Sequence, residues 1–279
     1  YYYCSSHSGM GGQANTPTTN SFSNFAGSIQ SNISPNTTAG FSIVTWTGSG
    51  ADATIGHGLS SAPEMYVVKN RSDSADWRVG QTVAGNTMTG GNGYYMEWNS
   101  TKASTNPGSA VTWGSTPTAP TSSVFTVGSN NAHNGSSDNM LAYCFHSVKG
   151  YSKIGSYVGN ASSNGTFVYT GFKPAFIMLK RVDSATNGNW AFSDNKRLNN
   201  SGNQDGGKGN YVPHTLAANL NSAESYFGGG SGNEQDFLSN GFKLRASGSY
   251  GNASGSTYLY YAIAENPFVT STGIPATAR

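Results

Sequence analysis

Two stretches of the chain share one order of apolar and polar positions. The apolar run at residues 65–68 is followed by basic residues, a polar loop and Trp77, and the run at residues 175–179 is followed by the same features and Trp190. Each run lies shortly after a proline and is shorter than a typical helix, so each is predicted to be a buried β-strand. Two copies of one pattern predict that the chain contains a sequence repeat.

Other short runs rich in β-branched and aromatic residues are also predicted strands, because Gly-, Ser-, Asn- and Thr-rich turn signals separate them. These runs cover residues 41–47, 77–81, 94–98, 124–127, 140–146 and 241–244. One short helix is expected within residues 215–225. The predicted fold is therefore all-β, with two tandem antiparallel β-sandwiches.

The repeat divides the chain into five predicted parts. Residues 1–8 resemble the closing strand of the later units, so we expect them to be the last strand of a partial preceding repeat. We expect residues 9–39 to form a linker, residues 40–149 and 150–268 to form the two β-sandwich repeats, and residues 269–279 to form a C-terminal tail.

Composition narrows the possible partners. Charged residues make up 10% of the chain, against about 25% in typical globular proteins, and the formal net charge is +2. This gives no electrostatic reason to expect a nucleic-acid partner. No apolar stretch approaches the roughly 20 residues that span a bilayer, so membrane insertion is not expected. Cys4 and Cys144 occur in similar contexts, and we expect two separate buried thiols rather than a disulfide.

Candidate catalytic and metal-binding residues do not form a convincing pattern. The five histidines lack zinc-ligand spacing, and the Gly-rich stretches do not match a phosphate-binding loop. The carboxylates are few and lie mostly in polar loops, where the raised pKa of a glycosidase acid is not expected. Asp73 and Asp76 supply too few oxygens for a calcium site. We predict no catalytic residue, no metal site and no cofactor.

Aromatic residues in or beside loops are the feature most favourable to a binding role. An aromatic ring can stack on the C–H groups of a sugar while neighbouring amides bind its hydroxyl groups. The alternative is that these rings close the ends of the sandwiches or lie in subunit contacts. The candidates for contact with a glycan or receptor are Tyr94, Trp98, Trp113, Tyr211 and Tyr226.

Several ordered runs of residues extend this interpretation. They include GFSIVTWT at residues 40–47, IGHGL at 55–59, GYSKIGSY at 150–157 and DFLSNGF at 236–242. Across residues 40–279 the chain resembles a tandem-repeat domain family of unknown function, found in tail-fibre and virion-surface proteins of marine tailed bacteriophages. The resemblance implies a structural role on the virion surface and a β-sandwich of jelly-roll or lectin-like type. It carries over no catalytic residue.

The leading hypothesis is a non-enzymatic virion structural protein. It would be the C-terminal part of a phage tail fibre or surface fibre, self-associating as a homotrimer beside other virion proteins and contacting the host cell surface. A second hypothesis is a carbohydrate-binding module that uses the loop aromatics to bind a host-surface glycan. The remaining alternatives are a polysaccharide-degrading tailspike with a carboxylate pair, a capsid decoration protein and an extracellular filament subunit.

Overall fold

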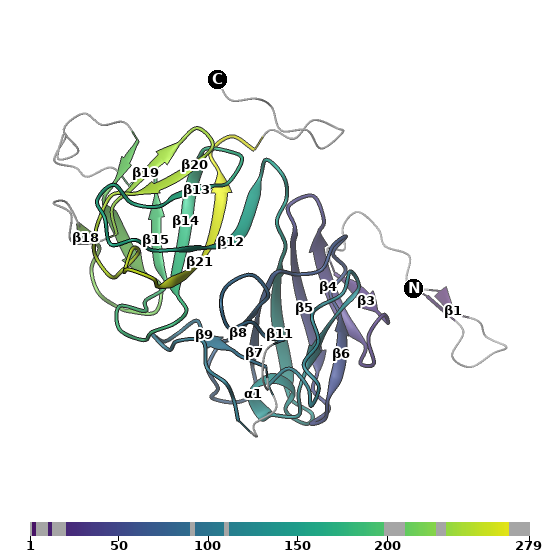
Figure 1. Cartoon of the computed structure of the whole chain (residues 1–279). Helices are drawn as coiled ribbons and strands as arrows, with labels where there is room; N and C mark the ends of the chain where they lie inside the picture. The colour runs from purple at the N-terminus through teal and green to yellow at the C-terminus, as the bar shows by residue number, and fades with distance from the viewer. Residues whose placement is uncertain are drawn as a thin grey trace.

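The computed structural model describes residues 2–3, 11–12, 21–89, 93–108, 112–197, 210–226 and 233–267. Nearly all of the regular structure is antiparallel β-strand (Figure 1), which confirms the all-β prediction. The elements are β1 (Tyr2–Tyr3), β2 (Gly11–Gly12), β3 (Phe22–Asn24), β4 (Ser31–Asn36), β5 (Phe41–Thr47), β6 (Ala53–Gly56), β7 (Met65–Asn70), β8 (Arg78–Gln81), β9 (Met96–Glu97), β10 (Val124–Val127), α1 (Asn131–Asn134), β11 (Asn139–Phe145), β12 (Ser152–Val158), β13 (Phe167–Tyr169), β14 (Pro174–Arg181), β15 (Ala191–Asp194), β16 (Tyr211–Val212), β17 (His214–Ala217), β18 (Ser225–Tyr226), β19 (Gln235–Leu238), β20 (Gly241–Leu244) and β21 (Thr257–Ala264).

Strands β3 to β11 form the N-terminal sandwich. Its large sheet has the order β3-β4-β5-β11-β7-β8-β9, and the antiparallel pair of β6 and β10 covers one face. Side chains alternate between the two faces of a strand, so Val44 and Trp46 of β5 point to the covered face. There they are buried with Ile55 of β6 and Phe125 of β10. This alternation produces the first hydrophobic core.

Strands β12 to β21 form the C-terminal sandwich. A six-stranded sheet in the order β12-β21-β14-β15-β17-β18 faces a four-stranded sheet in the order β13-β20-β19-β16. Ile177 and Leu179 of β14 and Tyr260 of β21 point between the two sheets, where they pack with Phe237 and Phe242. The second core is therefore separate from the first.

The two sandwiches pack against each other through the outer faces of their large sheets (Figure 1). Met65 and Val67 of β7, Met178 of β14 and Leu259 of β21 belong to a third buried cluster, here named the junction cluster. Its other buried members are Val79, Ala84, Met96, Ile154, Val182 and Trp190. Strands β7 and β14 are thus buried on both faces, which explains why their sequences are nearly continuous apolar runs.

Polar contacts at the rim of the junction cluster tie loops of one sandwich to strands of the other. The backbone N–H of Ser104 donates to the carbonyl of Val182 at 2.8 Å. The Ser156 hydroxyl donates to the carbonyl of Val83 at 2.7 Å. These hydrogen bonds cross from one sandwich to the other, so the two sandwiches have a defined relative position.

Both large sheets place a late strand between two earlier strands. Strand β11 lies between β5 and β7, and β21 lies between β12 and β14. In each case the strand after the central apolar run, β8 or β15, continues the sheet on the far side. The shared strand order agrees with the predicted sandwich architecture, while the sequence repeat itself stays a prediction.

Two local predictions are wrong. Within the expected linker at residues 9–39, β3 and β4 extend the large sheet, because β4 pairs with β5 along its length and Ile33 enters the first core. Within the helix expected at residues 215–225, His214–Ala217 forms β17 instead, since pairing with β15 buries Thr215 and overrides local helix propensity. The closing strand expected at residues 1–8 and the tail expected at 269–279 lie mostly or wholly outside the described residues.

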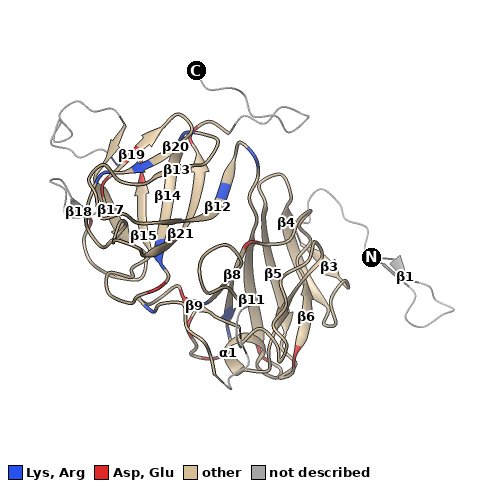
Figure 2. Cartoon of the chain, viewed as in Figure 1, with Lys and Arg blue, Asp and Glu red and all other residues tan. Residues whose placement is uncertain are grey.

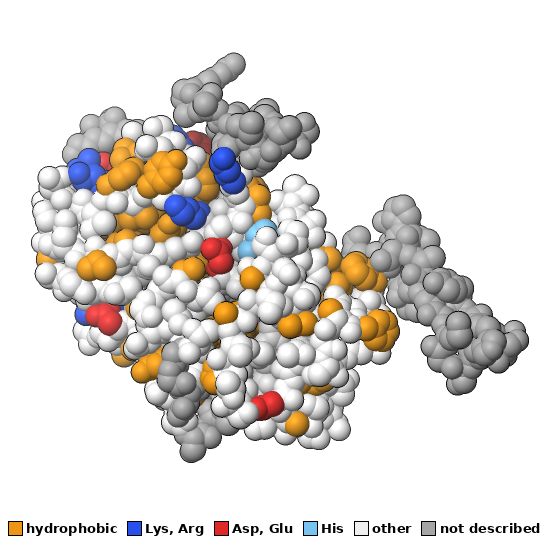
Figure 3. Space-filling model, turned by 45° about the vertical axis from the view of Figure 1, so that its right-hand side comes forward, with side chains coloured by type: hydrophobic (Ala, Val, Ile, Leu, Met, Phe, Trp, Pro, Cys, Tyr) orange, Lys and Arg blue, Asp and Glu red, His pale blue; other side chains and the backbone are white. Residues whose placement is uncertain are grey.

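Charged side chains are sparse over the described chain (Figure 2). The space-filling view in Figure 3 shows a face dominated by uncharged polar and backbone atoms, with scattered hydrophobic groups. Cys144 of β11 is a buried free thiol, as expected, while Cys4 lies outside the described residues. None of the described helical segments has the length and apolar character of a membrane-spanning helix.

Candidate functional site

An aromatic pocket lies at the edge of the junction cluster, where loops and strands of both sandwiches meet. It encloses about 340 Å³, which is within the range of about 300–1,000 Å³ typical of small-molecule sites. Four aromatic rings line it together with one amide side chain and one small residue. These residues are Trp77, Trp98, Asn99, Tyr143, Phe192 and Ala218.

The rings of the aromatic pocket pack on one another and on the junction cluster. Trp77 and Tyr143 are nearly parallel, with an angle of 12° and a centroid distance of 6.1 Å. Trp98 lies 6.1 Å from the ring of Trp190, which is fully buried beneath it. Trp77 and Trp98 are themselves only half-buried. The pocket therefore offers ring surface to solvent on a support that is rigidly packed.

The two half-buried tryptophans, Trp77 and Trp98, are positioned by an extension of the β8–β9 pairing. Beyond the pair of Arg78 and Glu97, the backbone N–H of Trp98 donates to the carbonyl of Trp77 at 2.9 Å. Asn99 Oδ1 accepts from the backbone N–H of Trp77 at 3.0 Å, and Asn99 Nδ2 donates to Asp76 Oδ1 at 2.9 Å. An amide and a carboxylate thus lie at the rim beside the ring surfaces.

Lys180 lies below the pocket and is almost completely buried, with 1% of its surface exposed. Its ammonium group donates to the carbonyls of Thr101 at 3.0 Å and Gly188, and lies 5.7 Å from the centroid of the Trp190 ring. Burial lowers the pKa of Lys180 to about 7, while the nearby charge of Glu97 acts in the opposite direction. Lys180 joins a loop of each sandwich and takes no part in lining the pocket.

The structure does not bring the five predicted contact residues together. Trp98 lines the aromatic pocket. Trp113 was expected beside a loop, but it is wholly buried in the first core, with Nε1 donating to the carbonyl of Tyr94 at 3.0 Å. It cannot present a ring to a ligand, because large apolar side chains are driven into the core whichever segment carries them.

The other three candidates lie elsewhere. Tyr94 is half-buried and accepts the Trp113 hydrogen bond through its backbone. Tyr211 is half-buried on β16, which pairs with β19. Tyr226 belongs to β18, where its backbone pairs with His214, and its side chain is outside the described set. Among the predicted residues whose side chains the structure describes, only Trp98 therefore contributes to the pocket.

No direct sequence signal indicated three of the pocket rings. Trp77 and Tyr143 occur in predicted strands, where aromatic residues are usually core residues. Phe192 lies in none of the predicted strands. A partial signal exists in β11, where Tyr143 lies between the buried residues Ala142 and Cys144. Apolar residues on both faces of one strand indicate a second covered surface, and the pocket opens at the edge of that surface.

Most of the acidic side chains that the structure describes are paired with cations. Glu97 contacts Arg78 at 2.5 Å and Lys102 at 2.7 Å, and Asp236 contacts Arg245 at 2.5 Å. Burial raises the pKa of Asp194, but hydrogen bonds from Arg197 outweigh it and hold the pKa below its usual value. In the part of the chain that the structure describes, no three His, Cys, Asp or Glu side chains are grouped to hold a metal ion.

Two buried histidines have contacts that indicate a role in the fold. His57 Nδ1 accepts from the backbone N–H of Leu59, and its Nε2 lies 3.1 Å from the carbonyl of Thr121. His133 of α1 packs edge-on against Trp113, and burial lowers its pKa to about 3. His133 is therefore neutral in the folded protein, and neither ring lies in the aromatic pocket.

The comparisons with known proteins add a family but no activity. Residues 14–267 match the model of a domain family of unknown function, DUF7483. No curated protein and no solved structure matches the chain.

Proposed function

The chain belongs to the domain family of unknown function DUF7483, and on that premise we propose that it is a non-enzymatic virion-surface protein that contacts the host by binding carbohydrate. The observation that carries this proposal is the aromatic pocket, in which two half-buried tryptophans lie beside Tyr143 and Phe192. A virion location rests on the resemblance of the residue runs at 40–47 and 150–157 to phage surface proteins.

The chemistry of the pocket suits a sugar ring. Indole and phenol faces attract the C–H groups of a pyranose and exclude water from them. The Asn99 amide and Asp76 carboxylate at the rim can exchange hydrogen bonds with its hydroxyl groups, because each retains bonding capacity beyond the contact between them. None of the described residues that line the pocket is a cation, so a neutral saccharide is the preferred ligand class.

Self-association as a homotrimeric fibre is part of the same proposal. Three large hydrophobic side chains on β12 and β13 are exposed: Val158 by 54%, Phe167 by 44% and Tyr169 by 59%. A second copy of the chain could cover them without burying many charges, because charged residues are only 10% of the sequence. Light scattering of a stable monomer at high protein concentration would contradict the fibre.

The binding proposal is tested by retention on immobilised host-surface polysaccharide and by competition with virus adsorption. Trp98→Ala is expected to weaken retention about 3- to 10-fold, in line with the roughly 0.5–1.5 kcal/mol of an aromatic contact. Phe25→Ala is the matched control, since Phe25 is 73% exposed and does not line the pocket. Equal retention of the two variants would refute a role for the pocket.

A second variant separates loss of binding from loss of folding. Ala218 is exposed at the pocket wall, so Ala218→Trp should fill the pocket while every aromatic contact beneath it is kept. We expect an unchanged melting temperature and retention reduced at least as much as in Trp98→Ala. A tailspike enzyme would instead release reducing ends from the polysaccharide, and such release would overturn the non-enzymatic assignment.

A further inference from the structure

A second, polar groove lies on the N-terminal sandwich, and it shares no residue with the aromatic pocket. It encloses about 450 Å³ between the turn before β4 and the ends of β5, β7 and β11. The side chains that give it its character are two hydroxyls, three amides and one guanidinium group. They belong to Gln30, Asn32, Thr45, Thr47, Arg71 and Asn139.

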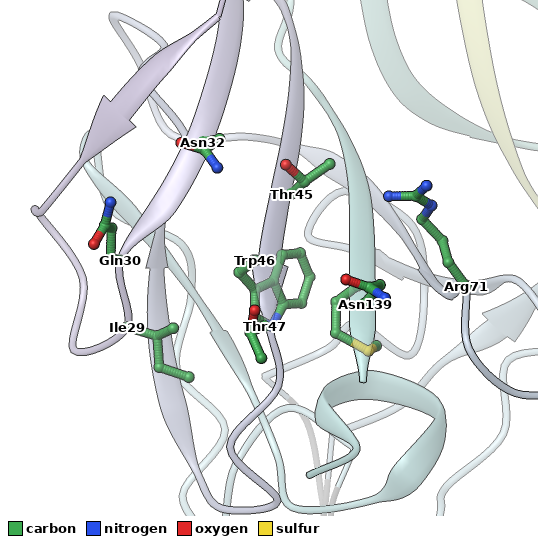
Figure 4. A pocket seen from close by; sticks show the side chains of 9 residues that line it. Ile29, Gln30, Asn32, Thr45, Trp46, Thr47, Arg71 and Asn139 are labelled. Atoms are coloured by element: carbon green, nitrogen blue, oxygen red, sulfur yellow. The ribbon is translucent and has the colours of Figure 1, made fainter. Parts of the chain in front are cut away.

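Strand pairing places these side chains on one face. Thr45 is in register with Asn32 of β4, and Thr47 is in register with Asn139 of β11. The backbone N–H of Arg71 donates to the carbonyl of Asn139 at 2.8 Å, which continues the β7–β11 ladder to the groove. In Figure 4 the Asn32, Thr45 and Arg71 side chains project from neighbouring elements around this open surface. The sheet therefore presents a row of hydrogen-bonding groups that ends at a cation.

Arg71 differs from the other arginines of the described chain. Arg78, Arg181, Arg197 and Arg245 each have a carboxylate within 4.0 Å. Arg71 is exposed and forms no ion pair with a described residue. The neighbouring Lys69 is already engaged, because its ammonium group donates to the carbonyl of Ala75. The guanidinium of Arg71 is therefore the cation available to a ligand in the groove.

We infer that the polar groove binds an acidic saccharide, with Arg71 holding its carboxylate or sulfate group. A guanidinium binds these planar or tetrahedral anions through two parallel hydrogen bonds, which an ammonium cannot reproduce. The amides of Gln30, Asn32 and Asn139 and the hydroxyl of Thr45 then bind the sugar hydroxyls, since each amide both donates and accepts. This site is independent of the neutral-sugar pocket proposed above.

The experiment is isothermal titration of the whole chain with three size-matched oligosaccharides: an oligogalacturonate, a sulfated galactan fragment and a neutral galactan fragment. We expect the wild type to bind at least one acidic oligosaccharide in a salt-sensitive manner. Arg71→Ala should reduce that affinity about tenfold or more, the size expected for a lost charge-assisted bidentate contact. Arg71→Lys should recover only part of it.

Lys149→Ala is the charge-matched control, because Lys149 is exposed in the turn between the sandwiches and does not line the groove. It should change the affinity less than about twofold, the effect of a distant screened charge. Trp98→Ala should leave acidic-saccharide binding intact, which keeps this test separate from that of the aromatic pocket. Absence of acidic-saccharide binding by the folded wild type, or equal affinities of Arg71→Ala and Lys149→Ala, would overturn the inference.

Discussion

The two ends of the outer face of the large N-terminal sheet have different surroundings: one end is covered and the other is open. On the outer face of β5 the side chains run Phe41, Ile43, Thr45 and Thr47. On β11 they run Phe145, Tyr143, Leu141 and Asn139, paired with the β5 residues in that order. The apolar end meets the C-terminal sandwich, where Phe145 contacts the ring of Tyr261 at 5.6 Å. The polar end stays open and forms the polar groove.

Backbone structure is the same at both ends, because one uninterrupted antiparallel register joins β5 to β11. The difference therefore comes from side chains alone. Burying Thr or Asn without hydrogen-bond partners costs free energy, whereas burying Phe, Tyr or Val releases water from apolar surface. A change from apolar to polar residues along each strand thus limits how far the second sandwich can cover the sheet, and leaves the remainder free for a ligand.

The largest expected effect comes from introducing a charged side chain at the apolar end of the sheet. Val67 is 1% exposed in the junction cluster, so Val67→Asp buries an unpaired carboxylate and should lower the free energy of unfolding by about 3–5 kcal/mol. Thr47→Asp is the matched control at the polar end, where the side chain is exposed, and should cost less than about 1 kcal/mol. Urea unfolding measures both. Similar losses for the two variants would contradict the contrast between the ends.

An intermediate effect is expected from Lys180, the buried cation beside Trp190 of the junction cluster. The pKa of Lys180 is about 7 in the folded protein and about 10.4 in an unfolded chain. Between these values the unfolded chain binds more protons, so stability rises with pH by at most about 1.4 kcal/mol per unit. Below pH 7 Lys180 is protonated in both the folded and the unfolded state, so its contribution to the pH dependence of stability vanishes.

The test compares urea unfolding of the wild type and Lys180→Met at pH 6, 7 and 8.5. From pH 7 to 8.5 the wild type should gain roughly 1.6 kcal/mol relative to the variant. Other titrating groups, including the buried Cys144 thiol whose pKa is raised by burial, are common to both proteins and cancel in the difference. Parallel pH profiles would mean that Lys180 is not held in a dry site.

The smallest effect is expected at the polar end. Thr45 is half-exposed, and its hydroxyl forms no hydrogen bond with a described residue. Thr45→Val should therefore change the free energy of unfolding by less than about 0.5 kcal/mol. Thermal and urea unfolding would detect a larger loss, which would assign the hydroxyl to the fold rather than to a ligand.

Local sequence patterns predicted the positions of the strands better than the surfaces that cover them. The strands at residues 41–47 and 124–127 were predicted with the bounds that β5 and β10 have. The run at residues 65–68 was predicted to be buried, but no pattern within it shows that another sandwich covers its second face. Alternation and strand-forming residues are local properties, whereas the identity of a covering surface depends on segments far away in the chain.

The candidate sites illustrate the same limit. Trp98 was predicted from its place beside a loop, yet Phe192 joins it only because the two large sheets pack face to face. Trp113 had the same local appearance as Trp98 and is wholly buried. Similarly, the Gly- and Ser-rich composition around β4 suggested a linker, because composition does not reveal that β5 has a free edge for β4 to pair with.

The insertion of β11 and β21 between earlier strands sets the order in which the protein can fold during its synthesis. As the chain leaves the ribosome, β5 and β7 are both complete long before β11, which must insert between them and hydrogen-bond to each. The N-terminal sandwich therefore cannot be completed before Phe145 has been synthesised. The junction cluster cannot be completed before Leu259 of β21 has been synthesised. Such long-range closure predicts slow folding, and a nascent chain that pauses before β11 would expose the unpaired edges of β5 and β7 to its neighbours.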